Sequence, residues 1–173
     1  MIAFDAGVLI AHRNPRLDEE LRVRIDSVIR AAGRTRKPII LPSPAVTEYL
    51  AGVGSPEATA AAHTVLHADR VFRVASFGER ASLELALTIA RVKNKQIRKS
   101  EGSTWAKAKF DWQIAAIAKV EGAATIYTTD HDVVRAADHM GIEGIYVPDM
   151  PLPDEARQKK IPFEPVNEDH GRW

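Results

Sequence analysis

The chain has 173 residues, of which 45% are hydrophobic and 27% charged, and these proportions allow one globular domain with a substantial core. It contains no cysteine, which excludes disulfides and thiolate metal sites and favours a cytoplasmic setting. The formal net charge is +1, so the large basic excess typical of strong polyanion-binding proteins is missing. The N-terminus lacks a basic leader, and no stretch reaches the ~20 apolar residues of a spanning helix, so no membrane association is expected.

Hydrophobic periodicity predicts strands that alternate with helices. The predicted strands are residues 2–5, 38–41, 71–75, 124–130 and 144–149. The predicted helices are residues 17–33, 43–52, 56–68, 79–92, 105–120 and 133–139, with Ser43 as a cap before Pro44. This alternation is typical of an α/β fold in which helices cover both faces of a central, mostly parallel sheet of about five strands.

The chain opens with MIAFDAGVLIAH, in which Asp5 closes an apolar run that otherwise reads as a buried strand. Aspartate is a poor strand former and is almost never fully buried without a partner, so Asp5 needs a group that neutralises it. Asp130 ends the fourth predicted strand as Asp5 ends the first. In a parallel sheet both residues would project from the same edge, where α/β folds bind ligands.

Two further acids lie in predicted helices. Asp111 continues the inward-facing stripe of Ile114 and Ala118, so it is expected to face protein rather than water. Glu48 lies away from the apolar stripe of its helix, and periodicity does not decide whether it joins the other acids. If the acids converge, their repulsion raises pKa values or destabilises the fold unless a divalent cation lies among them. Oxygen ligands without cysteine favour Mg²⁺ or Mn²⁺.

Four acidic motifs occur in order in three stretches of the chain, IAFDAGVLIA, PSPAVTEYL and KFDWQIAAIAKVEGAATIYTTDHD. Together they resemble the motifs of PIN-domain ribonucleases, most like the VapC-type toxins of bacterial and archaeal toxin–antitoxin pairs. The resemblance covers residues 1–147 and implies a PIN-like three-layer α/β/α nuclease domain. The residues that match the family's functional positions are Asp5, Glu48, Asp111 and Asp130 as an acidic quartet, Asp132 as an additional acid, and Thr128 as a hydroxyl residue that hydrogen-bonds a carboxylate or water.

The resemblance also implies an activity, which is metal-dependent endoribonucleolytic hydrolysis of RNA phosphodiester bonds. Mg²⁺ or Mn²⁺ would position and activate a water molecule. Asp5, Asp111 and Asp130 would bind the metal directly, and Asp132 would bind it through water or support the direct ligands. Glu48 would either bind the metal or assist the attacking water. An antitoxin protein that covers the acidic cleft and a homodimer are implied in the same way.

Positive charge is concentrated immediately before Asp111, where seven cations face one acid, Glu101, between positions 91 and 109. The cations expected to hold RNA phosphates are Lys95, Arg98, Lys99, Lys107 and Lys109. Binding through such contacts weakens as salt rises. Trp105 or Trp112 would offer a base a stacking face, or would pack helix against helix. The basic run could instead be a solvated loop.

The acidic motifs also have structural alternatives. Asp130 could simply cap the helix that follows it, and Glu48 could be an ordinary solvated acid. Asp5 could be a phosphoryl-accepting nucleophile like that of haloacid-dehalogenase-like phosphatases, although Gly7 stands where that motif needs a second aspartate. For the whole protein, the alternatives are a PIN-like RNA- or protein-binding scaffold without catalysis and a solitary RNA-processing nuclease.

Two other features are less informative. Residues 148–173 contain five prolines and many charges, which predicts a tail that is extended or mobile, or that becomes ordered against a partner. His63 and His67 lie four residues apart on a predicted helix and could ligate a metal, but the sequence offers no third ligand.

Overall fold

The computed structural model of the protein describes residues 1–14, 16, 18–93 and 105–157. Within these residues, a five-stranded sheet forms the centre of the molecule, and all of its strands are parallel. The strands are β1 (Ile2–Phe4), β2 (Ile39–Pro42), β3 (Phe72–Ala75), β4 (Thr125–Thr128) and β5 (Glu143–Tyr146). Their spatial order is β3-β2-β1-β4-β5, and this arrangement confirms the predicted α/β fold.

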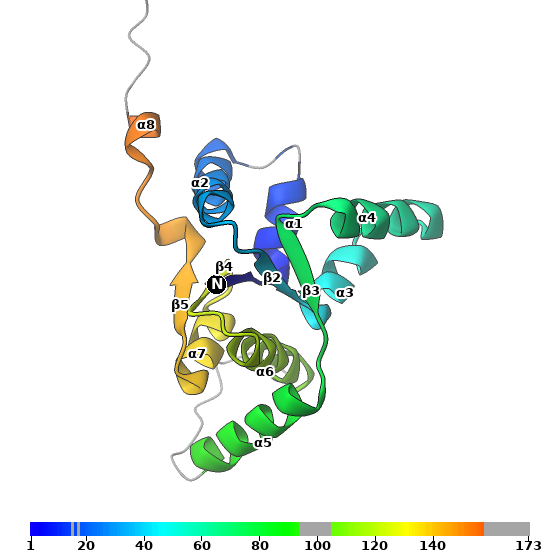
Figure 1. Cartoon of the computed structure of the whole chain (residues 1–173), viewed down its shortest axis with the longest axis vertical. Helices are drawn as coiled ribbons and strands as arrows, with labels where there is room; N and C mark the ends of the chain where they lie inside the picture. The colour runs from blue at the N-terminus through cyan, green and yellow to red at the C-terminus, as the bar shows by residue number, and fades with distance from the viewer. Residues whose placement is uncertain (15, 17, 94–104, 158–173) are drawn as a thin grey trace, which may run out of the picture.

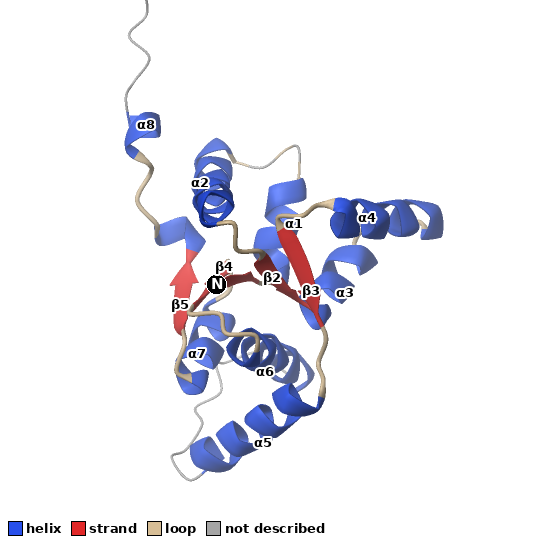
Figure 2. Ribbon diagram, in the orientation of Figure 1, coloured by secondary structure: helices blue, strands red, loops and turns tan. Residues whose placement is uncertain are grey.

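Helices cover both faces of the sheet, which gives three layers (Figures 1 and 2). The helices of the first half are α1 (Ala6–Arg13), α2 (Glu19–Thr35), α3 (Ser43–Ala51) and α4 (Pro56–Ala68). Those of the second half are α5 (Glu79–Lys93), α6 (Trp105–Val120), α7 (His131–Met140), the 3₁₀ turn η1 (Val147–Asp149) and α8 (Asp154–Arg157). In Figure 1, α1 and α2 lie above the sheet, and α5, α6 and α7 lie below it.

Alternating strand residues build a separate core on each face. Phe4 and Leu41 pack with residues of α1, α2, α3 and α4. Ala3, Ile40 and Ile126 pack with residues of α6 and α7 on the opposite face. All five of these strand residues are completely buried. β1 and β2 are nearly continuous apolar runs because both of their faces are covered, which is why the sequence pattern identified them.

The first predicted strand is confirmed, and the segment after it forms a helix for which the sequence pattern predicted no element. Residues 6–13 form helix α1. The side chain of Asp5 caps this helix by accepting a hydrogen bond of 2.8 Å from the backbone N–H of Val8. A short apolar segment does not separate helix from strand by periodicity, and the capping residue was the available signal.

Three smaller expectations also need correction. Ser43 is the first residue of α3 rather than its cap, and its hydroxyl accepts a hydrogen bond from the backbone N–H of Phe77 at 3.3 Å. Residues 147–149 form η1 instead of continuing β5. In the tail, residues 154–157 form α8, and Arg24 of α2 donates a hydrogen bond of 2.6 Å to the carbonyl of Met150. The prediction for the rest of the tail lies outside the described residues.

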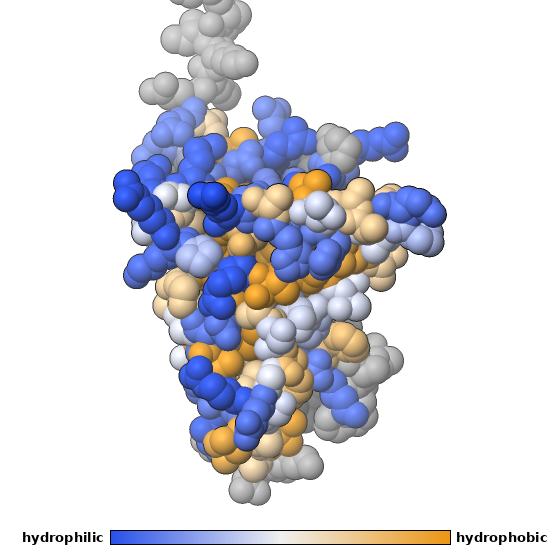
Figure 3. Space-filling model, turned by 45° about the vertical axis from the view of Figure 1, so that its right-hand side comes forward, coloured by the Kyte–Doolittle hydropathy of each residue, from blue (hydrophilic) through white to orange (hydrophobic). Residues whose placement is uncertain are grey.

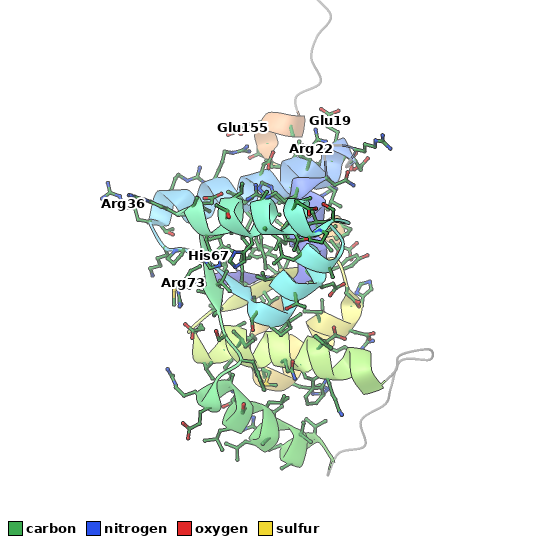
Figure 4. The ribbon with its side chains drawn as sticks, turned by 90° about the vertical axis from the view of Figure 1, so that its right-hand side faces the viewer. Glu19, Arg22, Arg36, His67, Arg73 and Glu155 are labelled. Carbon is green, nitrogen blue, oxygen red and sulfur yellow. The ribbon has the colours of Figure 1, made fainter. Side chains whose placement is uncertain are left out.

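The tail segment lies along α2. Glu155 of α8 is 3.9 Å from Arg30 of α2, and Figure 4 shows Glu155 at the same end of the molecule as Glu19 and Arg22. Such an exposed ion pair adds little stability by itself. None of the helices in the described ranges has both the length and the apolar character needed to cross a membrane.

Substitution of Gly144 by alanine is expected to destabilise the fold by about 1–3 kcal/mol, because a Cβ there would overpack β5 against α7. That Cβ would lie 2.8 Å from the Cα of Val134 and 3.1 Å from its carbonyl oxygen. Urea unfolding followed by circular dichroism measures the loss. The matched control is Gly33→Ala in α2, where nothing lies within 4 Å of the added Cβ. A Gly144→Ala protein as stable as this control would contradict the close packing.

Candidate active site

The position of the site follows from the order of the strands. β1 and β4 are neighbours, but the chain passes from β1 to β2 and β3 on one side and from β4 to β5 on the other. Adjacent parallel strands whose connections lead away in opposite directions leave a crevice at their carboxyl ends, where α/β proteins bind ligands. Asp5 immediately follows β1, and Asp130 lies two residues beyond the end of β4. Both acids therefore lie at this edge, as the sequence predicted.

A cavity of about 530 Å³ opens at this crevice. Four segments line it, namely the β1–α1 junction, α3, α6 and the β4–α7 junction. The lining residues are Asp5, Ala6, Gly7, Thr47, Glu48, Ala51, Phe110, Asp111, Ile114, Thr129, Asp130 and Val133. All four acids of the predicted quartet are among them, although they are separated by up to 125 positions in the sequence. The volume lies within the range of small-molecule and substrate pockets.

Asp5 is fixed in the cavity wall by two hydrogen bonds. Its Oδ1 accepts from the N–H of Val8, its Oδ2 accepts from the hydroxyl of Thr128, and its exposed fraction is only 3%. The pKa of Asp5 is raised to about 6, mainly by burial and to a smaller extent by the nearby charges of Asp130 and Glu48, whereas the hydrogen bonds from Thr128 and Val8 lower it. The negative charges of Asp130 in the β4–α7 junction and Glu48 in α3 therefore act on the carboxyl group of Asp5.

Thr128 connects the two strand ends. It is completely buried at the end of β4, and its hydroxyl, besides contacting Asp5, accepts a hydrogen bond of 2.8 Å from the backbone N–H of Asp130. The hydrogen bond to a carboxylate is the contact expected for this residue. Thr128 thereby sets the orientation of the Asp5 carboxylate relative to the backbone that carries Asp130.

Asp130 has the structural role that the sequence analysis gave as an alternative. Its Oδ1 accepts a hydrogen bond of 2.8 Å from the N–H of Asp132 and caps α7. It also lines the cavity with the other acids. Asp130 is therefore both the cap of α7 and part of the cavity wall.

Asp111 and Glu48 lie on facing helices. Asp111 is 7% exposed on α6, which confirms that it faces protein rather than water. Glu48 is exposed on α3, yet it lines the same cavity. The packing of α3 against α6 therefore places Glu48 with the other acids, which the periodicity of α3 could not show.

Asp132 does not line the cavity with the quartet, although its backbone N–H donates to the carboxylate of Asp130. The carboxylate of Asp132 accepts a hydrogen bond from Arg135 one turn later in α7. Of the predicted phosphate-binding cations, Lys95, Arg98 and Lys99 lie outside the described residues, as does the side chain of Lys107.

Lys109 is exposed near the start of α6, two residues before Asp111. Trp112 packs against the core, and its ring centroid is 5.3 Å from that of His139, so packing between α6 and α7 is its role here. The side chain of Trp105 lies outside the described part of the chain.

The donor chemistry of the cavity fits a hard divalent cation, because its ionisable lining groups are carboxylates. Among the described residues, however, no group of three or more histidine, aspartate or glutamate side chains is already gathered as a metal site. His63 and His67, whose ring centroids are 4.3 Å apart on α4, also lack a third such ligand in this part of the chain.

Gly7, Thr129 and Phe110 are among the lining residues that sequence reasoning did not assign to the site. A Cβ at Gly7 would lie 2.1 Å from the Oγ1 of Thr129, so glycine allows α1 to approach the β4–α7 junction closely. A glycine in the first turn of a helix, two residues after its capping acid, was the available signal. Nothing in the sequence pattern distinguishes Phe110 from a core residue.

Comparison with models of known protein families finds no match, and comparison with curated proteins finds no similar sequence.

Proposed function

We propose that the chain is a metal-dependent endoribonuclease of the PIN type, with Mg²⁺ or Mn²⁺ bound in the acidic cavity. The observation that supports this most is that carboxylates from four separate segments line one cavity at the β1/β4 crevice. Burial, with a smaller contribution from the negative charges of Asp130 and Glu48, raises the pKa of Asp5, and a divalent cation would offset this cost of ionising the carboxyl group.

Each acid has a distinct role in this proposal. Asp5, Asp111 and Asp130 would hold the cation, which when bound would activate a water molecule and offset the charge of the phosphate. The hydrogen bonds from Val8 and Thr128 hold the Asp5 carboxylate in one orientation and leave a lone pair on each oxygen. Such fixed orientation matters because a misplaced ligand weakens both binding and catalysis.

Glu48 would act on the attacking water. It is exposed on α3 and lines the cavity, so a water molecule can reach its carboxylate, whose oxygens can accept a hydrogen bond or a proton from that water. The water oxygen would bond to phosphorus as one phosphorus–oxygen bond of the RNA breaks, and the leaving oxygen would take up a proton. No side chain has to form a covalent intermediate.

Removal of the metal is the direct test. Purified full-length protein is incubated with single-stranded RNA in Mg²⁺ or Mn²⁺, with EDTA, and with EDTA followed by excess metal. We expect cleavage with metal, at least about a hundredfold loss with EDTA, and recovery when metal is restored. Cleavage that continues unchanged in EDTA would contradict the proposal. Sequencing the product ends then identifies the bond that is cut.

The VapC-like resemblance extends the proposal to a toxin that is held by an antitoxin and acts as a homodimer. Induced expression in a bacterial host is expected to arrest growth, and RNA ends mapped soon after induction should coincide with those cut in vitro. Arrest that persists in a protein with Asp111→Asn would separate growth inhibition from RNA cleavage. It would then favour the non-catalytic scaffold.

A further inference from the structure

An exposed aromatic ring stands beside the carboxylates of the cavity. Phe110 belongs to the cavity lining and is 49% exposed, whereas its neighbour Asp111 is 7% exposed. Ile114, one turn further along α6, also lines the cavity and is 3% exposed. One face of α6 therefore presents a carboxylate, an aliphatic residue and a partly hydrated ring to the same space.

Exposure alone does not make Phe110 a binding residue. Leu83 and Leu87 on α5 are 61% and 50% exposed, and Figure 3 shows hydrophobic residues at several places on the surface, including the end of the molecule where α5 lies in Figure 1. Scattered apolar residues of this kind need no special explanation. Leu83 and Leu87 are not among the cavity-lining residues, whereas Phe110 is.

The surroundings of the ring restrict what would cover it. Thr47 and Ala51 on α3 line the same cavity, so uncharged groups accompany the acids. The cation held by the acids would bind the phosphate, which leaves the ring and the uncharged lining residues available to the uncharged parts of the substrate. A nucleobase has a flat face that stacks on an aromatic ring whatever the base is.

We propose that Phe110 is the stacking surface for an unpaired RNA base next to the phosphate that is cut. This inference rests on the proposed ribonuclease function and adds a positioning residue to it. Bases within a duplex are already stacked on their neighbours, whereas the bases of single strands and loops are free to turn outward onto a protein ring. Phe110 therefore selects single-stranded RNA, with little preference for sequence.

The test measures binding and stacking separately from cleavage. Full-length protein is titrated, with Ca²⁺ in place of Mg²⁺, into a fluorescent eight-nucleotide single strand, the matching duplex, and a single strand that contains 2-aminopurine. The variants are Phe110→Ala, Phe110→Leu and Phe110→Trp. Leu83→Ala is the matched control, because it removes an exposed apolar side chain outside the cavity.

We expect Phe110→Ala to weaken single-strand binding about 5- to 150-fold, the range for loss of one stacked base, and to remove the quenching of 2-aminopurine. Phe110→Leu should bind nearly as weakly, because it restores apolar contact without an aromatic face. Phe110→Trp and Leu83→Ala should bind as tightly as the unchanged protein or more tightly. The duplex should bind more weakly than the single strand.

Three results would overturn the inference. The first is that the unchanged protein does not bind the single strand. The second is that Phe110→Ala or Phe110→Leu binds it as tightly as the unchanged protein. The third is that Phe110→Ala changes only self-association, measured by sedimentation, which would place a second copy over the ring. Stacking without cleavage in Mg²⁺ or Mn²⁺ would refute the ribonuclease proposal alone. Cleavage with unaltered binding in Phe110→Ala would refute the stacking role alone.

Discussion

Replacement of Asp5 by asparagine is expected to reduce RNA cleavage at least about a thousandfold, which corresponds to about 4 kcal/mol of lost transition-state stabilisation. Asparagine keeps an oxygen that can accept the hydrogen bond from Val8, but it removes the charge that would hold the cation. The measurement is single-turnover cleavage of one labelled RNA at saturating metal. Cleavage within tenfold of the unchanged rate would contradict the assignment of Asp5.

The control for this substitution is Asp138→Asn. Asp138 is exposed on α7 and is not among the residues lining the cavity, so it loses the same charge in the same chemical change. Its cleavage rate is expected to stay within about twofold of the unchanged protein, since distant surface charge has little effect at ordinary ionic strength. Equal losses in both variants would mean that net charge, rather than the cavity, controls the activity.

The sheet was predictable from the sequence because burial on both faces leaves a simple signal. β2 is a short, fully buried apolar run, and the helical stripe that contains Asp111 correctly predicted that its side chain faces protein. Helix α1 was not predictable in the same way. It is short, and apolar residues occur on several of its sides, so its sequence shows neither the periodicity of a helix nor that of a strand.

The candidate site was only partly predictable, for a different physical reason. Asp5 and Asp130 follow strands, so sheet geometry alone brings them to one edge. Glu48 joins them only because α3 packs beside α6, and Phe110 becomes a lining residue through the same contact. Asp132 matched a motif position, yet it pairs with Arg135 outside the cavity. How two helices pack against each other depends on the tertiary structure, so the periodicity of each helix does not predict it.

The stability of the protein in EDTA is expected to depend on pH through Asp5. Burial raises the pKa of Asp5 from 3.8 to about 6, so between these values the folded protein holds this proton while the unfolded chain releases it. Folding is therefore favoured at low pH, and the contribution of Asp5 declines as the pH rises through this window. At about 1.4 kcal/mol per pKa unit, the full difference is about 3 kcal/mol.

Comparison with Asp5→Asn isolates this contribution from every other titrating group. Between pH 4 and pH 7.5 in EDTA, the free energy of unfolding of Asp5→Asn should rise relative to that of the unchanged protein by about 2.4 kcal/mol, or roughly 5–10 °C in melting temperature. Thermal and urea unfolding at each pH measure this difference. A difference that stays constant with pH would contradict the raised pKa.

Mg²⁺ should restore the stability that is lost as Asp5 ionises at higher pH, because the cation replaces the proton as the partner of the Asp5 carboxylate. At pH 7.5 and about a hundredfold excess over its dissociation constant, Mg²⁺ should stabilise the unchanged protein by about 2.7 kcal/mol. The gain should be smaller at pH 5, where most Asp5 is protonated and the proton competes with the metal. Asp5→Asn should gain little at either pH, whereas Asp138→Asn should respond like the unchanged protein. Equal stabilisation of Asp5→Asn by Mg²⁺ would place the bound cation away from Asp5 and remove the link between charge crowding in this cavity and catalysis.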